Sequence, residues 1–367
     1  MAFNARDLAV DGVRELQPYQ PGKPAEELER DLGLSDIVKL ASNENPRTSS
    51  DVIAKALAQQ QSDTSRYPDG SGYTLKIRLS ELLGVSTDQL TLGNGSNDVL
   101  ELLVRAFVCP GQGVVVSEHS FAVYSLAASA VGADLKTAPA KSWGHDLNAM
   151  LSLIDQNTRI VFIANPNNPT GTWISETEVC TFLDSLPGSV ITVIDEAYFE
   201  YFSDAQMPDA VHLLNRYPAL VATRTFSKIY GLAGFRVGYG VSSPEIADIL
   251  NRVRQPFNVN SLALAAAEKA LKDQEFLISS RELNNQGMIQ LVNGMSSLGL
   301  QSIPSIANFL SVDLQKPAFP VFEKMLQRGV LVRPIANYGM PNHLRFTIGL
   351  EEENSKALVA LEKSLNE

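Results

Sequence analysis

The chain has 367 residues, of which 44% are hydrophobic and 19% are charged, and its formal net charge at pH 7 is −11. These values are ordinary for a globular protein, and the length favours two domains over one compact core. The negative charge argues against a protein that coats nucleic acid or an anionic membrane, so any bound phosphate must be held by a local group of donors.

The first forty residues contain acids among their bases, and nothing in them resembles the apolar core of a signal peptide. No stretch of the chain approaches the roughly 20 apolar residues of a membrane span. Cys109 and Cys180 are the only cysteines, which suits a reducing compartment, and the four histidines show no metal-ligand spacing. We therefore expect a cytoplasmic protein without a metal site, a nucleic-acid partner or a membrane partner.

Between about residues 90 and 260, short apolar runs alternate with helical patterns. Strands are predicted at QLTLG (89–93), GVVVSE (113–118), IVFIAN (160–165), VITVID (190–195) and ALVATRT (219–225). Helices are predicted at 98–107, 121–131 and 175–186. This alternation predicts an α/β fold whose mostly parallel sheet is covered by helices on both faces.

The last hundred residues have a different pattern. A helical stretch at 274–298 precedes the strand-like runs ANFLSVDL, GVLVRPI and HLRFTIG, and a closing helix follows at 352–365. This pattern predicts a smaller α+β domain. We expect a large domain over residues 41–275 and a small domain formed by 1–40 together with 276–367.

Open α/β sheets bind ligands beyond the carboxyl ends of their strands, so the residues after each apolar run are the informative ones. GNGSND follows the first run and opens a helix, where the backbone N–H groups of Ser96 and Asn97 could hold phosphate oxygens. Asp98 replaces the third glycine of a dinucleotide-binding motif, and no Walker lysine follows. Taken alone this signal is weak, and a plain N-capped helix explains the segment better.

Two further strand ends carry polar groups. The turn PNNPTG places the amide of Asn168 after one strand, and VITVID ends in Asp195, with Tyr198 three residues later. An ionised carboxylate at a strand end requires a cation or solvent, and no cation stands beside Asp195 in the sequence. A Pro/Asn turn and a solvated aspartate remain the structural alternatives.

The fifth run leads to a group of donors in apolar surroundings. It delivers Thr225, Ser227 and Lys228, and Arg236 follows in GFRVGYG. Two hydroxyls and a guanidinium, with the amides of GNGSN, are sufficient for one phosphate dianion. A buried ammonium is costly unless it is paired or neutralised, so we expect Lys228 either to reach the surface or to react.

One cofactor accounts for these strand ends together. Pyridoxal 5′-phosphate offers an aldehyde for a lysine, a protonated pyridine nitrogen for a carboxylate, a ring hydroxyl for an amide and a phosphate for a cup of donors. Each feature is weak alone, but their joint occurrence at successive strand ends favours a pyridoxal-phosphate enzyme.

With these motifs the sequence resembles the fold-type-I pyridoxal-phosphate aminotransferases, the aspartate-aminotransferase superfamily. NPNNPTG, DEAYFEY, the SK pair and AGFRVGYG carry the resemblance across the large domain. Along nearly the full length the chain is more narrowly similar to the histidinol-phosphate aminotransferase family, through ELQPYQPGKP, KLASNENP, RYPDGSGYTLK, GNGSND, VLVRPI and YGMPNHLRFTIG.

The resemblance implies a role for each motif residue. Lys228 would form the imine with the cofactor and carry the proton, Asp195 would pair with the pyridinium, and Asn168 and Tyr198 would bind the ring hydroxyl. The cofactor phosphate would be held by Ser96, Asn97, Thr225, Ser227 and Arg236.

Other implied roles concern the ring face, the partner subunit and the substrate. Phe121 would stack on the cofactor ring, where the family often has a tyrosine, and Tyr67 would reach the phosphate in the neighbouring subunit of a homodimer. Arg345, Arg333 and Tyr19 would line the substrate side, with Asn168 also in contact. The family usually has an acidic pair after GNGS, and this chain has Asn97 and Asp98 there. Phosphate binding through backbone N–H groups survives that change.

The implied reaction moves an amino group between L-glutamate/2-oxoglutarate and imidazole acetol phosphate/L-histidinol phosphate in histidine biosynthesis. Two alternatives share most of these motifs: an aromatic-amino-acid aminotransferase and the threonine-phosphate decarboxylase of cobalamin synthesis. A pyridoxal-phosphate-binding regulator is disfavoured, because only about forty mostly polar residues precede the first family motif and the chain is acidic.

Overall fold

The five predicted apolar runs form strands of one seven-stranded sheet, which has the order β2-β10-β9-β8-β7-β3-β4. The computed structural model describes residues 5–14, 16–17, 27, 30, 33–34, 36–48, 50–60, 65–202 and 207–367. The strands are β2 (Leu90–Gly93), β3 (Gly113–Ser117), β4 (Asp134–Ala138), β7 (Thr158–Ala164), β8 (Ile191–Asp195), β9 (Leu220–Thr225) and β10 (Gly238–Val241). The neighbours from β9 to β4 pair in parallel, and all five predicted strands are present.

Two strands of this sheet, β4 and β10, were not predicted. β10 pairs antiparallel with both β2 and β9, so it reverses the direction of the sheet at that edge. Its sequence GYGV contains two glycines and too few apolar residues to be recognised as a strand by composition. The sheet is therefore mixed but mostly parallel, as predicted.

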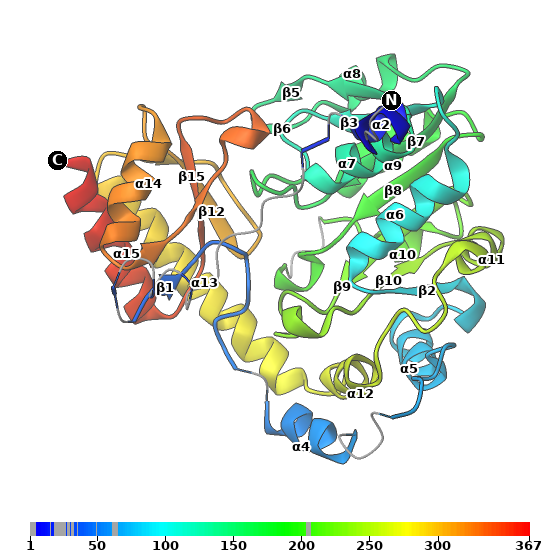
Figure 1. Ribbon diagram of the computed structural model, residues 1–367, viewed down its shortest axis with the longest axis horizontal. Helices are drawn as coiled ribbons and strands as arrows, with labels where there is room; N and C mark the ends of the chain where they lie inside the picture. The colour runs from blue at the N-terminus through cyan, green and yellow to red at the C-terminus, as the bar shows by residue number, and fades with distance from the viewer. Residues whose placement is uncertain are drawn as a thin grey trace.

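Helices cover both faces of the large sheet (Figure 1). One face packs Val193 and Val221 against the helices α6 (Ser96–Phe107), α7 (Ala122–Ala130) and α11 (Pro244–Val253). The other face packs Ile194 and Ala222 into a second apolar cluster. The helices that contribute to this second cluster include α5 (Tyr73–Leu83), α8 (Leu147–Ser152), α9 (Glu176–Asp184), α10 (Ala210–Leu213) and α12 (Ser261–Ala270). Neighbouring residues of one strand therefore face different layers, the period of two expected of strands.

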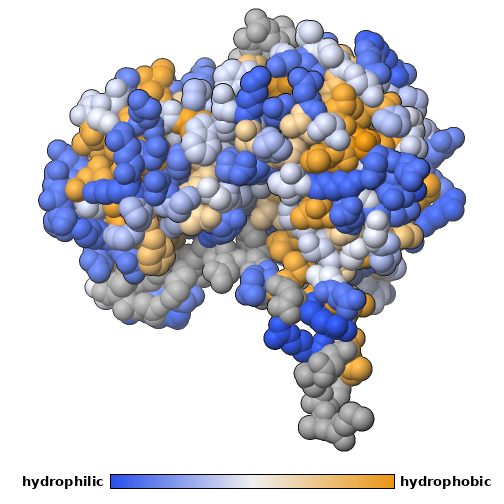
Figure 2. All heavy atoms as spheres, turned by 90° about the horizontal axis from the view of Figure 1, so that it is seen from above, coloured by the Kyte–Doolittle hydropathy of each residue, from blue (hydrophilic) through white to orange (hydrophobic). Residues whose placement is uncertain are grey.

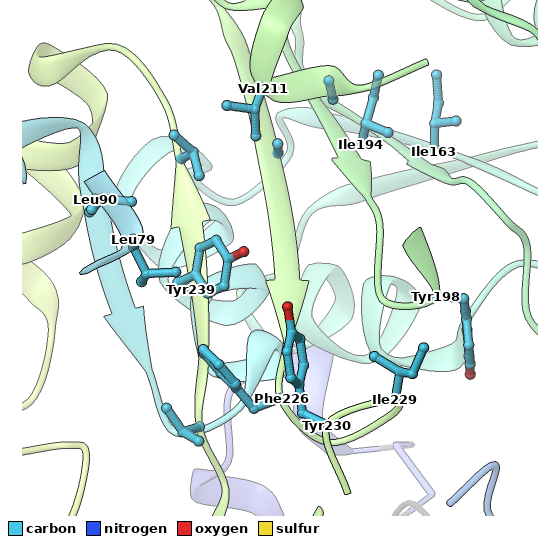
Figure 3. Packing of buried hydrophobic residues seen from close by; sticks show 14 of the residues in the cluster. Leu79, Leu90, Ile163, Ile194, Tyr198, Val211, Phe226, Ile229, Tyr230 and Tyr239 are labelled. Atoms are coloured by element: carbon cyan, nitrogen blue, oxygen red, sulfur yellow. The ribbon is translucent and has the colours of Figure 1, made fainter. Parts of the chain in front are cut away.

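The interior of the second cluster is rich in aromatic rings. Figure 3 shows Phe226 and Tyr230 together, with Tyr239 from β10 close by and Tyr198 at the other side of the view. The Phe226 ring lies 5.0 Å from the Tyr230 ring and 5.9 Å from the Tyr239 ring. These contacts fix the chain immediately after β9, where Lys228 stands.

The C-terminal part builds a second, smaller sheet. Its antiparallel order is β11-β12-β15-β14, with β11 (Gln301–Ser302), β12 (Phe309–Asp313), β14 (Arg333–Pro334) and β15 (His343–Thr347). The helices α13 (Gln274–Ser297), α14 (Ala318–Gln327) and α15 (Glu351–Leu365) pack on it. The run GVLVRPI was expected to be one strand, but its first half is β13 (Val330–Leu331), which pairs in parallel with β1 (Val38–Lys39) instead.

The long helix α13 runs from the large lobe into the small one (Figure 1). Near the N-terminus, α1 (Ala5–Leu8) and α2 (Asp11–Arg14) are short, and α2 lies against α7. α4 (Asp51–Gln60) packs on α12, and a two-stranded hairpin joins β5 (Ala140–Lys141) to β6 (Gly144–His145). Within the described ranges, 3-10 turns lie at Thr87–Gln89, Phe199–Tyr201, Ala233–Phe235 and Ala336–Tyr338.

Figure 2 shows hydrophilic side chains over both lobes, with the hydrophobic ones in separate patches between them. In the part of the chain that the structure describes, no helix is both long and apolar enough to cross a bilayer.

Candidate active site

A cavity of about 360 Å³ opens at the carboxyl ends of β7, β8 and β9 and reaches the small sheet. Its wall contains most of the residues that the sequence singled out. The lining residues are Lys39, Ala41, Ser42, Asn43, Ser96, Asn97, Phe121, Tyr124, Ala164, Pro166, Asn168, Asp195, Ala197, Tyr198, Thr225, Ser227, Lys228, Arg236, Arg333 and Arg345.

Asp195 lies at the end of β8 with 5% of its surface exposed. Its carboxylate accepts hydrogen bonds from the Tyr124 hydroxyl at 2.8 Å and the Thr223 hydroxyl at 3.1 Å. Burial raises the pKa of Asp195 above its ordinary value, although these two donors oppose that rise. Among the described residues no cation forms an ion pair with this carboxylate. The site therefore holds a buried acid that lacks a positive partner of its own.

Lys228 follows β9 and is partly buried in the cavity wall. Its ammonium donates to the carbonyl of Ser42 at 3.3 Å and lies 5.5 Å from the centre of the Tyr198 ring. Removal from water lowers the pKa of Lys228 to about 8, and the positive charge of Arg345 acts in the same direction. The unprotonated, nucleophilic form of this amine is therefore more populated near neutral pH than that of an ordinary lysine.

A cradle of donors forms where α6 begins. Gly95 precedes the helix with φ 80°, and the helix start has no side-chain cap. A Cβ on Gly95 would lie 2.4 Å from the guanidinium of Arg236, and one on Gly238 would lie 2.4 Å from the backbone nitrogen of Ser96. Glycine at both positions lets a cationic side chain and the first N–H groups of the helix converge, the arrangement that binds an anion.

Hydroxyls complete this cradle on the side of β9. Thr225 Oγ1 lies 3.0 Å from Ser227 Oγ, which accepts a hydrogen bond from Arg236 Nη1 at 3.1 Å. The sequence suggested buried surroundings for Arg236, and that expectation is wrong: the residue is exposed. Its left-handed backbone, with φ 57°, follows a short 3-10 turn and leaves the guanidinium at the rim of the cavity.

Arg345 reaches the cavity from β15 of the small sheet with 6% of its surface exposed. Its guanidinium donates to Asn168 Oδ1 and, at 2.8 Å, to the carbonyl of Ala41. Asn168 Oδ1 is thereby engaged as an acceptor, which leaves the amide N–H groups of Asn168 as donors. Inside the cavity, Arg345 thus connects the small sheet to the turn that follows β7 of the large sheet.

The structure does not bring every predicted residue into the cavity. Phe121 and Arg333 line it, but Tyr67 is 82% exposed and stacks on Phe257 with 4.7 Å between ring centres. Tyr19 lies outside the described residues. The placement of Tyr67 on the surface is what a contact with another subunit would require, and that contact remains a prediction.

Two residues that line the cavity, Asn43 and Tyr124, and one behind Asp195, Thr223, were missed by the sequence reasoning. Tyr124 and Thr223 bind Asp195, and Asn43 donates to the Tyr198 hydroxyl at 2.9 Å. Thr223 stands two residues before Thr225 on one strand, so the period of two could have placed it on the same face. Tyr124 sits among apolar helix residues and carried no signal of its own.

The charged and polar groups that line this cavity fit pyridoxal phosphate. The buried carboxylate of Asp195 would gain a cation from a protonated pyridine, and the cradle at α6 would gain a dianion. Among the described residues no carboxylate pairs with Arg236, so the cradle carries an uncompensated positive charge. In the same described part of the chain, no cluster of three or more His, Cys, Asp or Glu side chains could hold a metal ion.

The comparison with protein families gives the class directly. Residues 35–361 match the model of "Aminotransferase class I and II". The chain belongs to this family, and its chemistry is that of a pyridoxal-phosphate-dependent transaminase. The family, the enzyme class and the cofactor that the motifs predicted are confirmed.

Curated relatives resemble the chain over its whole length. A protein of Pseudomonas fluorescens named histidinol-phosphate aminotransferase 2 is 58% identical over 100% of this chain and 99% of its own. A protein of the same name from Pseudomonas aeruginosa is 54% identical over 98% of each chain. The predicted resemblance to histidinol-phosphate aminotransferases is confirmed.

Solved structures agree with this assignment. Histidinol-phosphate aminotransferase from Sinorhizobium meliloti, solved in complex with pyridoxal-5′-phosphate, has a TM-score of 0.89 and 28% identity over 97% of both chains. Aspartate aminotransferase from Thermus thermophilus has a TM-score of 0.83 over 99% of this chain, with 20% identity, and shares the fold. The aspartate-aminotransferase-like fold predicted from the sequence is confirmed.

Proposed function

We propose that this enzyme is a histidinol-phosphate aminotransferase, which transfers an amino group between L-glutamate/2-oxoglutarate and imidazole acetol phosphate/L-histidinol phosphate. The observation that carries the proposal is the single cavity in which Lys228, the buried Asp195 and the donor cradle at α6 meet. The relatives of 54% to 58% identity that bear this name support the choice of substrate.

We assign the cofactor contacts as follows. Lys228 would hold the cofactor covalently, Asp195 its ring nitrogen, and Asn168 and Tyr198 its ring oxygen. Phe121 would lie against the ring. The phosphate would be held by Ser96, Asn97, Thr225, Ser227 and Arg236. When bound, pyridoxal phosphate supplies an aldehyde that condenses with amines and a protonated ring that withdraws electrons from the reacting carbon.

Asp195 keeps the ring nitrogen protonated in this assignment. Its own hydrogen bonds from Tyr124 and Thr223 fix the carboxylate in one orientation and stabilise its charge. Asp195 is only 5% exposed, so little water screens the carboxylate and its interaction with a ring cation would be strong.

Lys228 moves the proton that leaves the α-carbon of the substrate. A general base works best when its pKa lies near the operating pH, and the pKa of this lysine is lowered to about 8. The carbonyl of Ser42, 3.3 Å from the ammonium, gives the released side chain a resting position inside the cavity.

Arg345 and Arg333 bind the anionic ends of the substrates. Glutamate carries two carboxylates and histidinol phosphate carries one phosphate, and a planar guanidinium suits both kinds of anion. Arg333 and Arg345 lie directly opposite each other on the paired strands β14 and β15, so the two charges are neighbours. Tyr19, which the family places on the substrate side, completes this proposal.

We further infer that the enzyme is a cytoplasmic homodimer. The exposed Tyr67, stacked on Phe257, would reach the cofactor phosphate of the partner subunit. Mixing an inactive Lys228→Ala chain with an inactive Tyr67→Ala chain should restore part of the activity, because one of the two sites in a hybrid dimer receives both intact residues. No recovery in hybrids that demonstrably form would argue against a shared site.

The substrate is tested by half-reaction spectra. Purified holoenzyme is mixed in turn with histidinol phosphate, glutamate and phenylalanine, and the conversion of the cofactor band is followed against time. We expect the largest kcat/KM with histidinol phosphate. A preference for phenylalanine would replace the proposal with an aromatic-amino-acid aminotransferase, and release of carbon dioxide without an oxo-acid acceptor would indicate the decarboxylase.

A further inference from the structure

Asn43 occupies an unusual position at the back of the cavity. It lies between β1 and α4 with 1% of its surface exposed, and its backbone is left-handed, with φ 55°. Asparagine is one of the few residues that tolerate this conformation. Its carbonyl accepts a hydrogen bond from Asn308 Nδ2 at 3.0 Å, and its N–H donates to Thr347 Oγ1 at 2.9 Å. Hydrogen bonds therefore fix both the backbone C=O and the backbone N–H of Asn43.

The hydrogen bonds around Asn43 have only one consistent direction. Its backbone N–H can only donate, so Thr347 Oγ1 accepts there and sends its own proton to Asn43 Oδ1, 3.2 Å away. The amide of Asn43 is thereby oriented with Nδ2 toward the Tyr198 hydroxyl, at 2.9 Å. An amide nitrogen can only donate, so the oxygen of Tyr198 accepts, and the proton of that hydroxyl must point elsewhere.

The remaining direction for that proton is the cavity. Within the described ranges the Tyr198 hydroxyl forms no hydrogen bond other than the one to Asn43. The Tyr198 ring is fixed by an edge-on contact with Phe309, 5.2 Å between centres. Figure 3 shows its hydroxyl directed away from Ile163 and Ile194. Burial raises the pKa of Tyr198, so the hydroxyl keeps its proton and acts as a donor at neutral pH.

We propose that Asn43 is a positioning residue: by occupying the acceptor side of Tyr198, it turns the O–H of that tyrosine toward the ring oxygen of the cofactor. The inference rests on the proposed function, because it needs pyridoxal phosphate in the cavity. A directed donor stabilises the anionic form of the ring oxygen. That oxygen then holds the proton of the Lys228–cofactor linkage less tightly, so the linkage loses its proton at lower pH.

The test is the pH titration of the visible absorbance of the holoenzyme. Asn43→Gly removes the amide but keeps the left-handed backbone, which glycine adopts without strain. We expect the midpoint of the titration to rise by about one pH unit, the size of one charge-assisted hydrogen bond. In a Tyr198→Phe background the same substitution should produce no further shift, because there is no hydroxyl left to orient.

Asn43→Asp provides a second variant, and it carries the test if Asn43→Gly does not bind the cofactor. A carboxylate at this position can only accept, so it should draw the Tyr198 proton away from the cavity and raise the midpoint. Its effect in the Tyr198→Phe background measures the contribution of the added charge alone. The shift in the native background should exceed that contribution.

The inference is overturned if both Asn43 variants titrate at the wild-type midpoint, or if their shifts are equal with and without the Tyr198 hydroxyl. Either result would leave Asn43 a purely structural residue while the cofactor assignment stands. Absence of a lysine-bound chromophore from the wild-type protein is a separate outcome, which would overturn the proposed function and this inference together.

Discussion

Two neighbouring carboxylates at the end of β8 have different surroundings and different partners. Asp195 faces the cavity, where it has hydroxyl donors but no ion pair with any residue that the structure describes. Glu196 faces the other layer and binds Arg224 at 2.8 Å. Arg224 also binds Asp209 at 2.7 Å and covers the ring of Phe199. Successive side chains of a strand face opposite sides of the sheet, so the two acids lie on different faces. At this edge of the sheet, the Arg224 ion cluster therefore lies on one face and the cavity lies on the other.

The charged groups on the two faces of this sheet edge therefore have different roles, one structural and one in ligand binding. In the Arg224 cluster, both carboxylates pair with the same guanidinium, and the cluster joins β8, β9 and the start of α10. In the cavity, Asp195 and Arg236 have hydrogen-bond partners but form no ion pair with any described residue, so a ligand can balance their charges. We infer that charges left unpaired at strand ends mark the binding site, and that the paired cluster holds those strand ends in place.

The largest expected effect is the difference in kcat between variants of Asp195 and of Glu196. Asp195→Asn should lower kcat by roughly a thousandfold, because a ring nitrogen that loses its proton no longer stabilises the developing charge. Glu196→Gln, the matched control, should keep kcat within about tenfold and lower the stability instead. Steady-state kinetics and urea unfolding of both variants measure this. Near wild-type turnover in Asp195→Asn would refute the pairing with the cofactor ring.

The Arg224 cluster predicts a large effect on stability. The side chains of Arg224 and Glu196 are 4% and 1% exposed, so Arg224→Leu leaves a buried acid without its cation. We expect a loss of about 3–5 kcal/mol in the free energy of unfolding. Arg216→Leu breaks a salt bridge whose partners are 61% and 50% exposed, and should cost less than about 1 kcal/mol. Equal urea midpoints for the two variants would show that the buried ion cluster stabilises the fold no more than the exposed salt bridge does.

A third test concerns the cationic side of the cavity. Arg345→Ala should lower kcat/KM about a hundredfold for both glutamate and histidinol phosphate, since a desolvated anion loses its guanidinium partner. Arg333→Ala should weaken the use of histidinol phosphate more than that of phenylalanine, which has no phosphate. An Arg345→Ala enzyme that loses activity with only one of the two anionic substrates would show that they bind to different groups.

The smallest expected effect is on the pKa of Lys228. In the apoenzyme, an amine-specific reagent should label this lysine with a midpoint near pH 8 rather than the ordinary 10.5. Arg345→Ala removes a neighbouring positive charge, so the protonated form becomes less unfavourable and the midpoint should rise, by less than about one pH unit. A midpoint close to the ordinary lysine value in the native apoenzyme would mean that Lys228 is solvated.

Much of the cavity was predictable because parallel strands bring distant segments to one edge. Asn168, Asp195 and Thr225 each follow an apolar run, and strand direction alone makes their ends coincide. Lys228 follows the same strand as Thr225. The fold class followed from the same alternation of strands and helices.

Other features depend on contacts that no local pattern encodes. The Asn43 amide meets Tyr198 from 155 positions away, and the Thr347 hydroxyl meets Asn43 from 304 positions away. β10 lacks an apolar run, so its reversal of the sheet edge was invisible to composition. The exposure of Arg236 follows from a left-handed residue after a 3-10 turn, which the apolar neighbours in GFRVGYG concealed.

The central claim is that the unpaired groups of the cavity are completed by pyridoxal phosphate bound through Lys228. Borohydride reduction of the purified protein, followed by peptide mass analysis, tests it directly. We expect a yellow protein whose reduced form carries the mass of the cofactor on the peptide that contains Lys228, and a Lys228→Ala variant without that modification. A cofactor fixed to another lysine, or no modification at all, would contradict the account.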